Sequence, residues 1–147
     1  MFDAVDTYRR ARSPKDGIED RRLKAVLLRT LVETGTSDTW ELAEQHYRKA
    51  WNISDKLAGL MCVYLSRHPR RMGLMDEAFE PWKDHLSAYT SYLTIIGSGA
   101  ADDVFDRLAL EEGRTTFRLA HPTHNRSLFM PMAANNKLLW TDRGIVW

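Results

Sequence analysis

Apolar residues recur at helical spacing in segment after segment of this chain, and this periodicity constrains the fold more than any other feature. The clearest case follows Asn52, where apolar side chains recur three and four residues apart until His68-Pro69. This spacing places them on one face of a helix, and Asn52 is a suitable N-cap. The residues on this face are Leu57, Leu60, Met61, Tyr64 and Leu65.

The same kind of pattern predicts further helices. One begins at Ile18 and ends before Gly35, a residue that commonly stops a helix. The next opens with Asp38 and Glu41, spaced three residues apart as in a capping box. The other predicted helices lie in residues 74–86, 88–96, 102–112, 115–120 and 125–134.

Two of these segments leave alternatives open. In residues 74–86, Pro81 either kinks the helix or sits in the first turn of a new one. Residues 88–96 are rich in Tyr, Thr and Ile, as strands often are, but no second alternating run is present to pair with them. We therefore expect a helix there, which ends at Gly97-Ser98-Gly99.

The length of 147 residues suits one helical domain over residues 1–147 with a single core. Helices of roughly 10 to 18 residues with short connections favour antiparallel packing of neighbours, in a bundle or in a solenoid of helix pairs. The sequence contains no exact internal repeat, so periodicity alone does not choose between these two architectures.

The charge balance argues against nucleic acid and membrane surfaces as partners. Lys and Arg number 21 and Asp and Glu number 20, and acidic residues are interleaved with the basic clusters. The longest apolar run, Leu57 to Leu65, is far shorter than the roughly 20 residues of a membrane-spanning helix. Cys62 is the only cysteine and the start of the sequence is acidic, without the pattern of a secretory signal, so we expect a cytoplasmic protein.

The sequence lacks the common catalytic motifs, so we expect neither a catalytic residue nor a bound metal or cofactor in it. No His is followed by Glu, which excludes the His-Glu-x-x-His zinc motif, and Gly-x-Ser-x-Gly and phosphate-binding loops are also missing. His121 and His124 lie close together, but they straddle a proline and have no evident third ligand. A small enzyme built around these two histidines is the weakest of the interpretations.

Several segments resemble, in order and spacing, the C-terminal helical domain of the M1 family alanyl aminopeptidases, the bacterial aminopeptidase N group. The most specific match is residues 52–58, which are similar to the family's Asn-Met-Thr-Asp segment. Residues 125–129 resemble its Asn-Arg-x-Arg-Ser-Leu stretch, although the region around them is compressed here. Weaker matches lie in residues 21–28, 74–82, 92–93, 135–136 and 142–144.

The resemblance implies an all-α fold: a right-handed superhelix of antiparallel helix pairs, an armadillo/HEAT-like solenoid. It also implies a fragment of a larger multidomain enzyme, in which this region covers a zinc-containing catalytic domain and gates the access of short peptides. The zinc and the catalytic residues would then belong to other domains, which would be its partners. Arg126 matches an arginine that faces the enclosed cavity in the family, and it is the candidate for substrate or interdomain contact.

A free-standing helical-repeat adaptor with a concave protein-binding surface is the alternative. Exposed apolar patches distinguish the two, because a domain taken from a larger protein leaves its former interface uncovered. Trp140 and Trp147 lie outside a clear helical stripe. We expect them to meet another domain if the chain is part of a larger enzyme.

Overall fold

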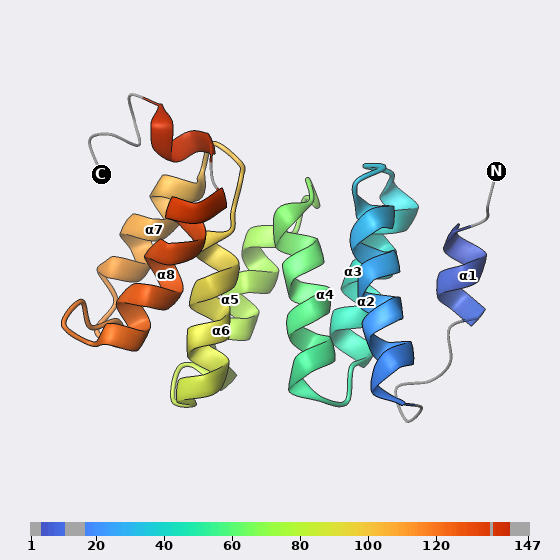
Figure 1. The fold of residues 1–147 in the computed structure, drawn as a ribbon, viewed down its shortest axis with the longest axis horizontal. Helices are drawn as coiled ribbons and strands as arrows, with labels where there is room; N and C mark the ends of the chain where they lie inside the picture. The colour runs from blue at the N-terminus through green and yellow to red at the C-terminus, as the bar shows by residue number, and fades with distance from the viewer. Residues whose placement is uncertain (1–3, 11–16, 136, 142–147) are drawn as a thin grey trace. The chain divides into compact units, whose positions relative to one another are not determined.

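The computed structural model describes residues 4–10, 17–135 and 137–141. Within these ranges the chain forms eight α-helices and one 3-10 helix, and none of these residues lies in a β-strand (Figure 1). The all-α prediction is confirmed for this part of the chain. The elements are α1 (Ala4–Arg10), α2 (Ile18–Val32), α3 (Ser37–Lys49), α4 (Ile53–Leu65), α5 (Arg71–Trp82), α6 (Leu86–Gly97), α7 (Val104–Glu112), α8 (Pro122–Asn135) and η1 (Lys137–Trp140).

The chain divides into two compact units, residues 1–75 and residues 76–147. In the first unit α3 packs against α4 and α2, α2 also contacts α4, and α1 lies on α2. In the second unit α6 packs against α8 and α7. Successive helices within each unit run in opposite directions, as the short connections predicted (Figure 1). One domain over residues 1–147 stays a prediction.

The helices of the first unit begin and end where the sequence supplies caps and stops. α2 ends at Val32, and Gly35 follows with a φ of 69°, a left-handed conformation that glycine adopts without steric cost. Asn52 caps α4 as predicted, because its Oδ1 accepts a hydrogen bond from the backbone N–H of Asp55 at 2.8 Å. The core of this unit includes Leu28, Leu31, Ala43, Leu60 and Val63.

The predicted capping box of Asp38 and Glu41 is wrong. The N-cap of α3 is Thr36, whose Oγ1 accepts a hydrogen bond from the backbone N–H of Thr39 at 3.4 Å. The threonine hydroxyl starts the helix earlier and leaves Asp38 inside the first turn, where its negative charge favours the positive end of the helix dipole.

Pro81 lies inside α5, one residue before its end, so the alternative in which it starts a new helix is wrong. Proline has no N–H to donate to the carbonyl of Glu77, four residues earlier. The helix ends at Trp82 directly afterwards, and the missing hydrogen bond therefore falls in its last turn.

Residues 88–96 are helical, as predicted. They belong to α6, which ends at Gly97, and Tyr89, Tyr92 and Ile96 on this helix are buried. The helical period thus outweighs the strand preference of the Tyr, Thr and Ile residues, since no partner strand is available among the described residues. α7 ends at Glu112, and Gly113 is its C-cap.

The short helix predicted for residues 115–120 is absent. This segment forms separate turns, closed by hydrogen bonds from the Phe117 N–H to the Arg114 carbonyl and from the His121 N–H to the Arg118 carbonyl. The turns allow Phe117 to point into the core, where it is 7% exposed. α8 then begins at Pro122, three residues earlier than predicted, because proline is well suited to the first turn of a helix. The sequence analysis did not predict α1 or η1.

Candidate functional site

Arg126 is exposed on α8, in the second unit. None of the described residues forms a hydrogen bond or an ion pair with its side chain, so its guanidinium is available to a peptide or to another domain. This placement is compatible with the role that the resemblance implied, and the role itself stays a prediction.

The histidine pair one turn before Arg126 is part of an aromatic cluster. The rings of His121 and His124 stack with their centroids 4.2 Å apart, and the rings of His124 and Tyr89 pack edge to face with their centroids 5.2 Å apart. The Nδ1 atom of His124 accepts a hydrogen bond from the backbone N–H of Arg118 at 3.3 Å. Burial lowers the pKa of His124, and the nearby His121 and Arg118 lower it further.

No group of three or more His, Cys, Asp or Glu side chains with the geometry of a metal site occurs among the described residues. The third ligand that a zinc site at His121 and His124 requires is therefore not found in that part of the chain. The arrangement favours packing of the two imidazoles against aromatic rings, as in a core.

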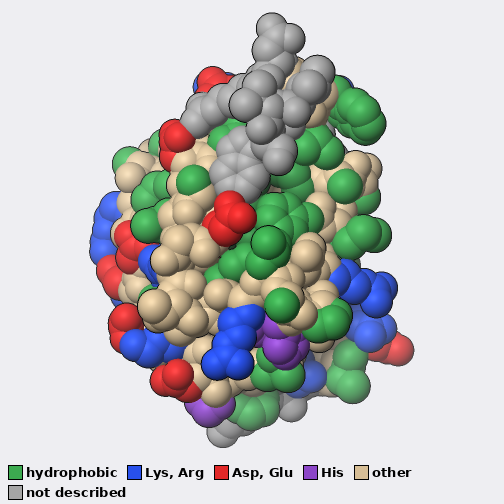
Figure 2. Space-filling model, turned by 90° about the vertical axis from the view of Figure 1, so that its left-hand side faces the viewer, with side chains coloured by type: hydrophobic (Ala, Val, Ile, Leu, Met, Phe, Trp, Pro, Cys, Tyr) green, Lys and Arg blue, Asp and Glu red, His purple; other side chains and the backbone are tan. Residues whose placement is uncertain are grey.

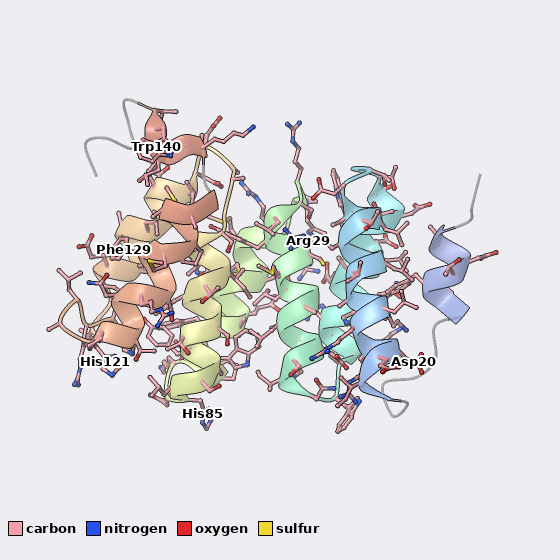
Figure 3. The ribbon with its side chains drawn as sticks, in the orientation of Figure 1. Asp20, Arg29, His85, His121, Phe129 and Trp140 are labelled. Atoms are coloured by element: carbon pink, nitrogen blue, oxygen red, sulfur yellow. The ribbon has the colours of Figure 1, made fainter. Side chains whose placement is uncertain are left out.

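One face of the second unit is markedly apolar. Figure 2 shows hydrophobic side chains gathered in the middle of this face, with an acidic side chain beside them and Lys or Arg and His side chains below. The exposed fractions of Leu119, Met130 and Trp140 are 56%, 56% and 77%. Figure 3 places Trp140 on η1 and Phe129 on α8, on this side of the unit. Trp140 is thus exposed, and its contact with another domain stays a prediction, whereas Trp147 lies outside the described residues.

A buried ionic network joins α6, α7 and the middle of α5. Arg107 is 2% exposed and Glu111 is fully buried, and the Nη2 atom of Arg107 lies 3.3 Å from Oε1 of Glu111. Arg107 also donates to Oδ1 of Asp76 at 2.7 Å and to the Tyr92 hydroxyl, which in turn donates to Glu111 at 3.0 Å. Arg114 completes the network 3.4 Å from Glu111.

Burial dominates the electrostatics of this network. It raises the pKa of the Glu111 carboxyl, although the charges of Arg107 and Arg114 and the Tyr92 hydrogen bond act in the opposite direction. Two guanidinium groups and a phenol thus surround a single carboxylate that is shielded from water. Such a cluster fixes how α6 and α7 pack, and its buried members Arg107, Glu111 and Tyr92 are engaged with one another.

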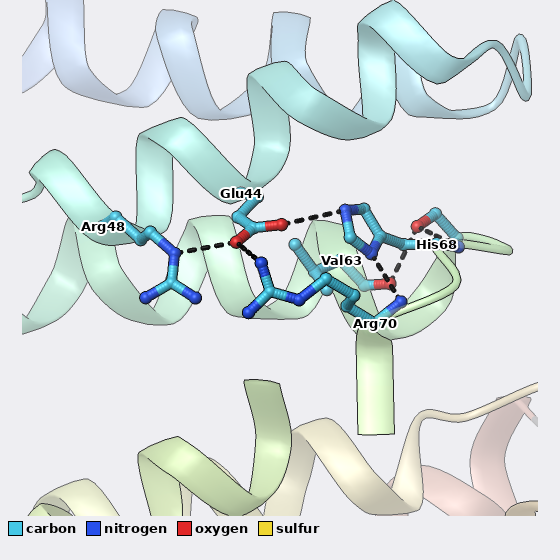
Figure 4. Close-up of polar contacts among 6 residues, drawn as sticks. Glu44, Arg48, Val63, His68 and Arg70 are labelled. Atoms are coloured by element: carbon cyan, nitrogen blue, oxygen red, sulfur yellow. Dashed lines mark hydrogen bonds and ion pairs between the residues drawn. The ribbon is translucent and has the colours of Figure 1, made fainter. Parts of the chain in front are cut away.

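A second polar cluster ties α3 to the loop between α4 and α5 (Figure 4). Oε1 of Glu44 accepts from Arg48 at 2.7 Å and from Arg70 at 2.8 Å, and Oε2 lies 3.3 Å from Nε2 of His68. The Nδ1 atom of His68 accepts from the Arg70 N–H at 3.0 Å, so the proton of the neutral ring is on Nε2, facing Glu44. His68 is 5% exposed, and its two ring nitrogens are both engaged in structural contacts.

A cavity of about 600 Å³ opens in the first unit between α1, α2, α3 and the start of α4. The sequence analysis did not identify it, because its walls come from four segments whose proximity depends on tertiary packing. Within it the Tyr8 hydroxyl and the Nδ1 atom of His46 form a hydrogen bond of 2.8 Å. Burial raises the pKa of Tyr8 to about 12, so the phenol keeps its proton at neutral pH.

Residues 1–144 match the family described as "Domain of unknown function (DUF3458_C) ARM repeats". No curated protein matches the chain. Armadillo repeats are stacked antiparallel helices, so this match and the helix order together confirm the predicted fold class of an all-α, armadillo-like helical repeat. None of the described helices has both the length and the apolar composition needed to cross a membrane.

Proposed function

Because the chain belongs to the DUF3458_C family of ARM-repeat domains, we propose that it is the helical C-terminal domain of an M1 zinc aminopeptidase. In this proposal it supplies no catalytic residue, covers the active site and gates the access of short peptides. The family match over residues 1–144 carries the proposal, and the ordered segments that resemble the aminopeptidase N group add the identity of the parent enzyme.

Two structural observations support a role as one domain of a larger enzyme. The large exposed apolar side chains of the second unit, among them Leu119, Met130 and Trp140, are of the kind that another domain covers. Arg126 adds a permanent positive charge on the same helix as Met130, and a guanidinium binds carboxylates with two parallel hydrogen bonds. A peptide carboxylate or an acidic side chain of the catalytic domain would be its partner.

The first test is to read the encoding gene upstream of Met1 for a continuous frame that contains His-Glu-x-x-His. If it is present, Arg126→Ala in the full-length enzyme should raise the KM for short peptides several-fold while the melting temperature stays within about 1 °C of the parent. Arg22→Ala, an exposed arginine of the first unit, is the matched control and should leave KM unchanged. An unchanged KM in the Arg126 variant would contradict the proposed contact between Arg126 and the peptide or the catalytic domain.

The ARM-repeat fold itself supports the second candidate, a free-standing adaptor that binds protein ligands on a concave helical surface. The same gene reading separates the two candidates. A frame without any His-Glu-x-x-His segment would leave the aminopeptidase proposal without its zinc site, and the adaptor would take its place.

A further inference from the structure

The cavity in residues 1–75 carries opposite charges towards its two ends. The face of α3 that lines it reads, from the start of the helix to its end, Asp38, Glu41, Gln45 and Lys49. The acidic pair lies near the beginning of α3, whereas Lys49 is its last residue. We propose that this cavity binds a short unblocked peptide, with its ammonium group at the acidic end and its carboxylate at the basic end.

The basic end gains further cations from other helices. α2 runs antiparallel to α3, so Arg21 and Lys24, near the start of α2, lie towards the end of α3 (Figure 1). Asp55 also lines this end, but its carboxylate already accepts a hydrogen bond of 2.7 Å from the side chain of Asn52. Arg21, Lys24 and Lys49 thus bring cationic side chains to this end of the cavity, which suits a carboxylate.

Glu41 and Lys49 have no partners within residues 4–10, 17–135 and 137–141. Both side chains are exposed at the cavity, and none of the described residues forms an ion pair or a hydrogen bond with either of them. They are eight residues apart on α3, which corresponds to about 12 Å along the helix axis. An extended peptide covers roughly 3.3–3.6 Å per residue, so three or four residues span this distance and a single amino acid does not.

The middle of the cavity suits the body of such a peptide. Leu42 and the ring of Tyr8 offer apolar surface for its side chains, and Gln45 offers both a donor and an acceptor for its backbone. The hydrogen bond between Tyr8 and His46 fixes the two rings at the floor, and Lys24 lies 4.8 Å from the centre of the Tyr8 ring. The ligand is therefore a tripeptide or tetrapeptide with small apolar side chains and both ends free.

This inference does not depend on the proposed function, because it concerns the 147-residue chain alone. Trialanine titrated into the labelled chain at millimolar concentrations should shift the backbone amide resonances of α3 and the start of α2. N-acetylated trialanine and trialanine amide should each bind about tenfold more weakly, since each loses one charge-assisted contact. Alanine alone should cause no comparable shifts.

Two variants assign the ends of the peptide. Glu41→Gln should weaken the binding of trialanine about tenfold but leave the binding of the acetylated peptide unaffected. Lys49→Gln should likewise weaken the binding of trialanine but leave the binding of trialanine amide unaffected. Glu112→Gln and Lys137→Gln, exposed positions in residues 76–147, are the matched controls and should bind like the parent. The proposal fails if trialanine causes no shifts at the cavity, if blocking either end has no effect, or if the two variants act equally on all three peptides.

Discussion

Gly59 of α4 lies directly against the backbone of Tyr47 in α3: a β-carbon on this glycine would be 2.6 Å from the Tyr47 backbone nitrogen. At the end of α6, a β-carbon on Gly97 would likewise overlap the carbonyl oxygen of Leu128 in α8. Each of the two main helix pairs, α3 with α4 and α6 with α8, thus packs backbone to backbone at one glycine. No side chain fits there without separating the helices.

Substitution of either glycine by alanine should therefore destabilise the chain. Alanine favours an isolated helix by about 1 kcal/mol over glycine, but the clash at Gly59 or Gly97 should outweigh this and lower the free energy of unfolding by roughly 1–3 kcal/mol. The measurement is urea denaturation followed by far-UV circular dichroism.

Gly73 supplies the control. It is an exposed residue of α5, and none of the described atoms lies within 4 Å of the β-carbon it would gain. Gly73→Ala should leave the stability unchanged or raise it by up to about 1 kcal/mol. Equal effects at the three positions would contradict the close-packing argument.

The buried network around Glu111 should respond differently to single and double substitutions. Arg107→Met leaves the Glu111 carboxylate buried without its main partner, and we expect a loss of roughly 3–5 kcal/mol. The double variant Arg107→Met with Glu111→Leu removes both charges and should cost less than the single one. Unfolding free energies from guanidinium titrations test this order.

Asp76 gives a matched comparison within the same network. It bonds to Arg107 at 2.7 Å, but its side chain is 57% exposed, so Asp76→Asn should cost less than about 1 kcal/mol. A cost as large as that of Arg107→Met would show that the exposed contact, and not the buried one, holds the network together.

The local part of this fold could be predicted from the sequence. Helical periodicity identified α2, α3, α4 and α6, and the amide of Asn52 identified the start of α4, because each of these signals involves residues within one or two turns. The start of α3 was predicted wrongly because two neighbouring residues could both cap the helix. The hydroxyl of Thr36 is the N-cap, and the predicted Asp38 lies in the first turn.

The long-range part could not be predicted. Arg107 and Glu111 have the spacing of a solvated surface pair, and only their packing against Tyr92 of α6 buries them. The cavity beside Tyr8 and His46 likewise depends on contact between residues that lie far apart in the sequence. The pattern of charged residues along one helix does not specify which other helix packs against it.

Acid should destabilise the protein well above the pH at which carboxylates titrate. Burial lowers the pKa of His46, His68 and His124 in the folded chain, because a charged imidazole is poorly hydrated at a buried position. A histidine with a depressed folded pKa contributes stability above its unfolded pKa, about 6.5, and this stability is lost as the pH falls through the folded pKa. Thermal melts from pH 8 to pH 5 should therefore show a falling melting temperature.

The contribution of His68 can be isolated by substitution. His68 faces Glu44, whose negative charge opposes the effect of burial, and Arg70, whose positive charge adds to it. His68→Gln removes this titration and should make the stability depend less on pH between pH 7 and pH 5. His85→Gln, at an exposed position, is the control, and an equal flattening in that variant would refute the assignment to His68.

Cys62 should report the opening of the first unit. The sequence analysis interpreted it as a buried apolar residue, and it is 4% exposed. Burial raises the pKa of its thiol to about 12, so at pH 8 the reactive thiolate should be on the order of a thousandfold rarer than for an ordinary cysteine. Reaction with a disulfide reagent should therefore be slow in the native chain and fast in denaturant.

Gly59 lies one turn before Cys62 on α4, so Gly59→Ala should accelerate the labelling, whereas Gly73→Ala should not. Labelling of the unmodified native chain as fast as that of a free thiol would show that α4 is not held in the core.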